Sequence, residues 1–165
     1  MFGFWLMFFI PAWAVLVPRR LPQRQAVVAW WAVGLLFTLM IGLRHEVGGD
    51  WGSYAEHFTH AARMTFGEAL AMGDPGHYLL NRLVAGLGGS LYTVNLIYAA
   101  VLMTGTVVFC RRQPIPWLAL LAAVPYMLVV VGMGYTRQSV ALGFGLLGLV
   151  ALADGKVRKF AFWVV

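Results

Sequence analysis

Long apolar runs separated by short polar segments dominate this chain and predict its architecture. The apolar runs extend over residues 2–17, 26–43, 91–109, 117–134 and 135–153, and a sixth begins near residue 160. A bilayer core about 30 Å thick needs roughly 20 helical residues, at about 1.5 Å of rise per residue. Each run therefore predicts a membrane-spanning helix, although the fifth reaches full length only if residues 135–138 belong to it. The pattern indicates an all-α, polytopic transmembrane helix bundle.

The sixth apolar run stops at Val165, shortly after it begins. We therefore expect residues 1–165 to form one membrane domain, the N-terminal part of a longer protein with several further spans; a damaged reading frame is the alternative.

The longest polar segment, residues 44–90, carries the signals of three short helices. Their starts are marked by Asp50, by the T-x-x-E capping box of Thr65 and Glu68, and by Asp74 followed by Pro75. The pair Gly88-Gly89 ends the third helix. We expect these helices to lie in the outer interface of the membrane, as a lid or a re-entrant element.

Composition excludes several classes of protein. The chain is 61% hydrophobic and 11% charged, whereas soluble domains are about 45–50% apolar and about 25% charged. An ordinary soluble enzyme, a disordered tail and a secreted disulfide scaffold are thereby excluded. The net charge of +6 is compatible with nucleic-acid binding. However, the cations lie in short clusters between apolar runs, so we expect no nucleic-acid partner.

The distribution of cations predicts the orientation in the membrane. One side would carry eight cations: Arg19, Arg20, Arg24, Arg111, Arg112, Lys156, Arg158 and Lys159. The other side would carry four: Arg44, Arg63, Arg82 and Arg137. The positive-inside rule makes the first side cytoplasmic, so the N-terminus and the loop 44–90 face outward. Five of the six acidic residues and all four histidines then also face outward.

Arg137, at the start of the fifth apolar run, is the strongest candidate for a functional residue. The N-terminus of a helix carries partial positive charge and free N–H groups, so an arginine there would form a strong anion site. Gly132 and Gly134 just before it would allow the backbone to approach a ligand closely. The alternative is an arginine that snorkels to the lipid headgroups.

Arg44 holds the corresponding position at the outer end of the second run, with the same snorkelling alternative. The residues from Arg44 to Asp50 combine a cation, the carboxylates of Glu46 and Asp50, and two glycines where the chain leaves the membrane. Asp50 also has a structural explanation, as the N-cap of the following helix.

Two apparent motifs have plainer explanations. Gly143, Gly145 and Gly148 spell G-x-G-x-x-G, but inside an apolar run the small residues Ala141 and Gly145 indicate close helix packing instead. His57 and His60 are three residues apart on a predicted helix, which supplies at most two ligands of a zinc site. We interpret the histidines as solvated interface residues and expect no metal and no cofactor.

Three blocks of residues resemble the signature of the EpsG family. They are Gly42-Leu43-Arg44 with Val47-Gly48-Gly49-Asp50-Trp51, Tyr54 and Phe58; Asp74-Pro75-Gly76-His77-Tyr78-Leu79-Leu80-Asn81; and Tyr135-Thr136-Arg137-Gln138-Ser139-Val140-Ala141. The corresponding family patterns are G-x-R…V-G-x-D-Y-x-x-Y-x-x-x-F, E-P-G-[FY]-x-L-L-N and R-Q-x-x-A. Trp51 stands where the family has Tyr, and Asp74 where it has Glu.

The resemblance implies a Wzy-like glycosyltransferase of the bacterial inner membrane that polymerises exopolysaccharide, capsule or O-antigen. Its substrates would be oligosaccharide repeat units on undecaprenyl diphosphate, and its partners would include membrane lipids and proteins of chain-length control and export. Arg137, Arg44 and Asp50 would be catalytic. Substrate-binding residues would be Gln138, Tyr54, Trp51, Asn81 and Glu46, with Glu46 a weaker choice than Asp50 as the base. A flippase for lipid-linked sugars and a non-catalytic assembly subunit are the alternatives.

Overall fold

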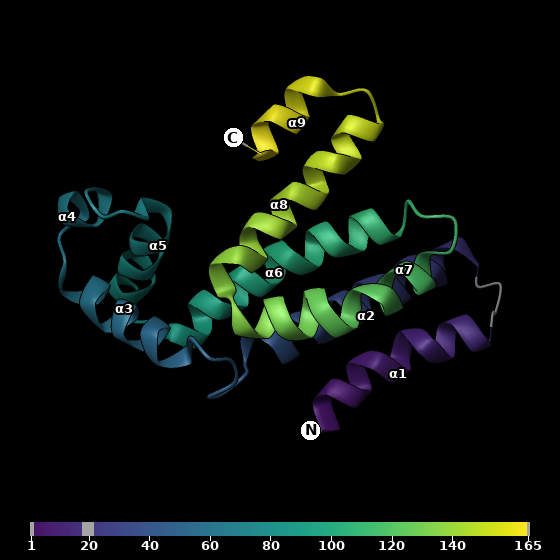
Figure 1. Cartoon of the computed structure of the whole chain (residues 1–165), viewed down its shortest axis with the longest axis horizontal. Coiled ribbons are helices and arrows are strands. Elements are labelled where there is room, and N and C mark those ends of the chain that lie inside the picture. Colours follow the sequence, from purple (N-terminus) through teal and green to yellow (C-terminus); the bar gives the residue numbers. More distant parts are fainter. Residues whose placement is uncertain (1, 18–21, 165) are drawn as a thin grey trace.

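The body of the protein is a bundle of helices, most of which run close to its long axis, while the last two rise away from it (Figure 1). The computed structural model describes residues 2–17 and 22–164, and within these ranges every regular element is a helix. The bundle contains α1 (Phe2–Leu16), α2 (Gln23–Gly42), α6 (Leu91–Cys110), α7 (Pro116–Ala123) with its π-helical continuation η1 (Val124–Gly132), α8 (Thr136–Ala153) and α9 (Val157–Val164). The predicted all-α fold class is confirmed.

Three helices, α2, α6 and α8, are long and apolar enough to cross a membrane. The apolar helices over Gly3–Leu16 and Pro116–Gly132 are shorter. The number of spans and the orientation of the chain stay predictions. Arg19 and Arg20, on which the orientation partly rests, lie outside the described residues.

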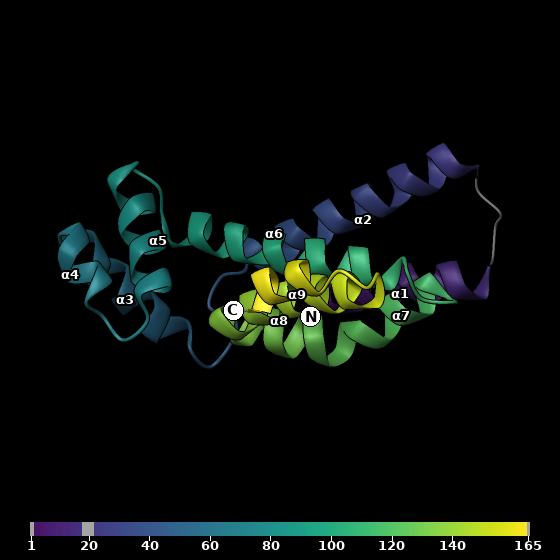
Figure 2. The same cartoon turned by 90° about the horizontal axis from the view of Figure 1, so that it is seen from above.

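The loop between α2 and α6 folds into a separate group of helices at one end of the bundle (Figures 1 and 2). These are α3 (Trp51–Arg63), α4 (Phe66–Leu70) and α5 (Pro75–Gly86). The predicted capping box at Thr65 and the Asp74 cap are both present, and Gly88 follows α5 with a φ of +75°. The end of α2 and the starts of α6 and α8 lie at this same end of the bundle (Figure 1).

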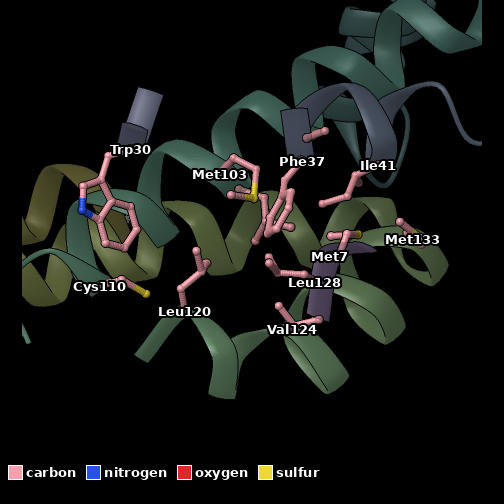
Figure 3. Packing of buried hydrophobic residues seen from close by; sticks show 12 residues of the cluster. Met7, Trp30, Phe37, Ile41, Met103, Cys110, Leu120, Val124, Leu128 and Met133 are labelled. Atoms are coloured by element: carbon pink, nitrogen blue, oxygen red, sulfur yellow. The ribbon is translucent and has the colours of Figure 1, made fainter. Parts of the chain in front are cut away.

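The apolar core joins the first two helices to the middle of the bundle (Figure 3). Met7 of α1, Phe37 of α2, Leu102 of α6 and Leu128 of η1 are fully buried there. Apolar side chains are also plentiful on the outside of these helices, as expected for surfaces that face lipid tails. Between such helices, close packing and not the exclusion of water supplies the attraction.

The closest approach in the bundle joins α6 to α8 through two glycines. A Cβ on Gly105 would collide with the carbonyl oxygen of Gly143, and a Cβ on Gly143 would lie 2.7 Å from the carbonyl oxygen of Val101. The prediction of close helix packing therefore holds for α8, but the residues chosen for it were wrong. Ala141 is exposed, and a Cβ on Gly145 would have no neighbour within 4 Å. The face of α8 that packs on α6 is instead the one that carries Gly143.

This contact predicts opposite effects for two neighbouring glycines. We expect Gly143→Ala to lower the melting temperature in detergent, because overpacking costs about 1–3 kcal/mol. Gly145→Ala is the matched control, since its Cβ enters open space and replacing a helical glycine stabilises by up to about 1 kcal/mol. Thermal unfolding followed by circular dichroism measures both variants, and equal melting temperatures would contradict the glycine contact.

Candidate functional site

A polar cavity of about 330 Å³ opens at the start of α8, beside the helices of the outer loop. Three segments that are distant in the sequence supply its walls: the start of α3 with the turn before it, the turn before α5, and the start of α8. The lining residues are Asp50, Tyr54, Asp74, Tyr135, Arg137, Gln138 and Ala141. Four of the predicted site residues, Arg137, Asp50, Gln138 and Tyr54, are therefore brought together here.

Arg137 is the cation of this cavity and is held by two neighbours. Its Nη1 lies 3.3 Å from Oδ2 of Asp74, and its guanidinium carbon lies 6.0 Å from the ring centre of Tyr54. The backbone N–H of Arg137 donates to the hydroxyl oxygen of Tyr54 at 3.5 Å. The side chain is nevertheless 48% exposed. The guanidinium is thus oriented by its neighbours while N–H donors remain accessible from the cavity.

Tyr54, in the first turn of α3, contacts the arginine. It is only 5% exposed, so most of its ring packs against protein. Its contacts with Arg137 join α3 to the start of α8. Tyr54 therefore supports the arginine in addition to forming part of the wall.

Asp74 has two roles, only one of which was predicted from the sequence. Its Oδ1 accepts the backbone N–H of His77 at 3.3 Å and so caps α5, as predicted. Its Oδ2 faces Arg137. These two residues are 63 positions apart, so no local spacing could have indicated the pair. The one signal in the sequence was that Asp74 stands where the EpsG family pattern has an acidic residue.

Asp50 stands directly before α3, at the N-cap position, but its carboxylate makes no capping hydrogen bond. The structural explanation predicted for Asp50 is wrong in this respect, because its backbone angles (φ −96°, ψ 8°) are not those of a residue whose side chain turns back to the helix. The carboxylate lines the cavity instead, and within the described residues it has no ion-pair partner.

Arg44 is buried and does not line the cavity. It is 6% exposed, its Nη1 donates to the carbonyl of Ile41 at 2.8 Å, and its guanidinium carbon lies 6.0 Å from the ring of Trp51. Its Nε has no partner in the part of the chain that the structure describes. Burial lowers the pKa of Arg44 to about 10, which leaves the side chain charged at neutral pH.

The other predicted substrate-binding residues also lie outside the cavity wall. Trp51 packs against the rings of His45 and Tyr92, 5.8 and 5.9 Å away. Glu46 is exposed and pairs with His45 at 3.8 Å. Asn81 is fully buried, where its Nδ2 donates to the carbonyl of His77 at 2.7 Å.

A turn at Gly48 brings the segment after Arg44 against the start of α8. Gly48 has a φ of +100°, and a Cβ there would lie 2.7 Å from the carbonyl oxygen of Met133. Any other residue would be strained at this φ and would collide with the backbone. This close approach positions Asp50, two residues later, at the cavity.

The histidine nearest the site is buried, which sequence reasoning missed. The Nδ1 of His77 lies 2.9 Å from the hydroxyl of Tyr98 on α6, and the ring of His57 packs 5.6 Å away. The interpretation of the histidines as solvated is therefore wrong for His77, because α5 packs on α6 with this side chain between them. Among the described residues no three His, Cys, Asp or Glu side chains gather as metal ligands would.

Burial of His77 predicts a pH-dependent stability. Desolvation lowers its pKa to about 4 from an ordinary value of 6.5, so the unfolded chain binds the proton more readily than the folded one. We expect stability to be complete above about pH 6.5 and to fall as the pH is lowered toward 4. The melting temperature of His77→Gln should change less between pH 7 and pH 5 than that of the wild type. His45→Gln, at an exposed position, is the control, and a wild-type pH profile for His77→Gln would contradict the assignment.

Comparison with known proteins gives one relationship. The model of the EpsG family matches residues 27–165, a range that includes every residue of the cavity wall. Neither the curated proteins nor the solved structures give a match. Because the family match covers most of the described chain, this protein, with its apolar helices, is a membrane protein of the EpsG family.

Proposed function

We propose that the chain acts as a glycosyltransferase that joins oligosaccharide repeat units carried on undecaprenyl diphosphate. Membership of the EpsG family supports a role in polysaccharide biosynthesis. The observation that carries the proposal is the cavity at the start of α8, where the guanidinium of Arg137 and the carboxylate of Asp50 line one space. The cation suits the leaving group, and the carboxylate suits the attacking hydroxyl.

The reaction exchanges one bond for another at the anomeric carbon of the donor. A hydroxyl oxygen of the acceptor sugar attacks that carbon, the bond from the carbon to the diphosphate oxygen breaks, and the lipid diphosphate leaves with the electron pair. Negative charge therefore grows on phosphate. Donors fixed beforehand at that place stabilise the transition state more than the ground state, and Arg137 in the first turn of α8 has this position.

The acceptor hydroxyl loses its proton during the attack, and Asp50 is the base that the geometry favours. Its carboxylate lines the cavity without a capping hydrogen bond. Asp74 is already engaged by Arg137 and by the N–H of His77, so it orients the arginine. Glu46, the weaker candidate, does not line the cavity.

The remaining substrate contacts follow from the cavity wall. Gln138, exposed beside Arg137, can donate to and accept from sugar hydroxyls. The polymer would be an exopolysaccharide, a capsule or an O-antigen of a bacterium, assembled on the outer face of the inner membrane. Proteins of chain-length control and export would then be its partners.

Replacement of Arg137 tests the role of the cation. We expect Arg137→Ala and Arg137→Lys to leave single repeat units on the lipid where the wild type makes long chains. Losing one transition-state donor costs about 10²–10³-fold in rate, and lysine lacks the planar fork of arginine. The measurement is the length distribution of surface polysaccharide in a deletion strain that carries each variant at equal membrane abundance.

Arg158→Ala, at an exposed position in the first turn of α9, is the matched control for loss of a cation and should give normal chains. Long chains from Arg137→Ala would overturn the proposal. Lipid-linked units that accumulate on the cytoplasmic face in the deletion strain would favour a flippase.

Variants at Asp50 and Asp74 should distinguish a residue that takes part in the reaction from one that orients Arg137. We expect Asp50→Asn to reduce polymerisation by about 10²–10⁴-fold, the usual contribution of a general base, with no change in melting temperature because the carboxylate caps nothing. Asp74→Ala should lower the melting temperature, since it removes the N-cap of α5, and should reduce the rate less. Single-turnover assays and thermal unfolding of both variants test this pairing, and a wild-type rate for Asp50→Asn would exclude it as the base.

A further inference from the structure

A second cavity, of about 350 Å³, adjoins the first at the Arg137–Asp74 pair. Arg137 and Asp74 line both cavities, whereas the other lining residues differ. The ion pair is therefore the common wall between two compartments. Most residues that line the first compartment carry a polar group, namely Asp50, Tyr54, Asp74, Tyr135, Arg137 and Gln138. The second is polar only near the pair, where His77 and Tyr98 lie.

The far end of the second cavity is apolar and belongs to the bundle. Ile97 and Val101 of α6 and Val140 and Phe144 of α8 form its walls. Both helices are candidate membrane spans, and these residues lie within the first three turns of each helix. Ile97 is 38% exposed, so the apolar end is open at the side of the bundle, where lipid would surround it.

We propose that the second cavity binds the lipid end of the donor, namely the diphosphate and the first isoprene units of a polyprenyl chain. A soluble anion would use only the polar end, and a sugar would leave its hydroxyls unpaired against the apolar wall. A polyprenyl diphosphate matches both ends, since the anion meets Arg137 and the chain lies between α6 and α8. The inference rests on the proposed function and assigns the first cavity to the acceptor sugar.

The ion pair can open to admit the diphosphate. Both partners are partly exposed, at 48% for Arg137 and 40% for Asp74, and such pairs are weak in water. Asp74 keeps its bond from the N–H of His77 through Oδ1, so it holds its position when Oδ2 loses the arginine. Arg137 also keeps Tyr54 as a neighbour. The diphosphate thereby replaces one carboxylate oxygen without unfolding the site.

Photo-crosslinking tests the assignment without requiring catalysis. Val140, which lines the cavity, is replaced by p-benzoylphenylalanine, and the purified protein is placed in phosphatidylcholine nanodiscs with undecaprenyl diphosphate that carries no sugar. Leu142, two residues along α8, exposed and outside both cavity walls, is the matched control. We expect at least fivefold more crosslinking to the lipid from position 140 than from position 142.

Competition identifies the recognised part of the ligand. Farnesyl diphosphate should suppress the crosslink at position 140, whereas inorganic diphosphate at the same concentration should not. In a second variant pair, Val101→Trp should fill the cavity and reduce crosslinking from position 144, and Leu149→Trp, at an exposed position of α8, should not. Equal crosslinking at 140 and 142, or equal competition by inorganic diphosphate, would overturn the lipid site.

The outcomes separate this inference from the polymerase itself. Loss of polymer in Arg137→Ala together with unselective crosslinking would leave the polymerase standing and reject the lipid cavity. Selective crosslinking together with long polymer from Arg137→Ala would keep the lipid cavity and reject the catalytic role of Arg137.

Discussion

The contact between the backbones of Gly105 and Gly143 determines the geometry on which the site depends. No residue with a side chain fits at either position without moving a helix, so α6 and α8 approach each other closely through backbone atoms. Arg137 lies six residues before Gly143 on the same helix. The position of the arginine relative to α6, and the width of the gap beside Ile97 and Val140, are therefore set by a contact between two residues that carry no chemistry.

A second constraint attaches the outer helices to this frame. His77 of α5 and Tyr98 of α6 pair in a buried position, while Tyr54 of α3 contacts the backbone of Arg137. Both contacts are polar and largely withdrawn from water, so each is costly to break. The outer loop is consequently fixed at two points, one on α6 and one on α8, and Asp74 lies between them. A loop that joined the bundle only through its ends would not hold two carboxylates beside the arginine.

The sequence predicted the helices well because their signals are local. Apolar runs and capping residues such as Thr65 and Asp74 act over a few positions, and they appear in the structure where expected. Arg137 and Asp50 were singled out from the sequence for the same reason, since each is unusual where a helix begins. The pairing of Arg137 with Asp74 and the burial of His77 depend on how distant helices meet, which no local pattern encodes. The error over Ala141 and Gly145 has this origin too, because a small-residue motif says that a face packs but not which neighbour it meets.

The two arginines that seemed equivalent in the sequence occupy different surroundings. Arg44 is buried, its Nη1 is taken by the carbonyl of Ile41, and its charge persists against the cost of desolvation. To reach a phosphate in either cavity it would have to leave that position and the ring of Trp51. Arg137 needs no such movement, because its guanidinium already lines both cavities. In the proposed reaction, stabilisation of the charge on the leaving group therefore falls to Arg137, while Arg44 lies in the turn that carries Asp50 from the end of α2 to the cavity.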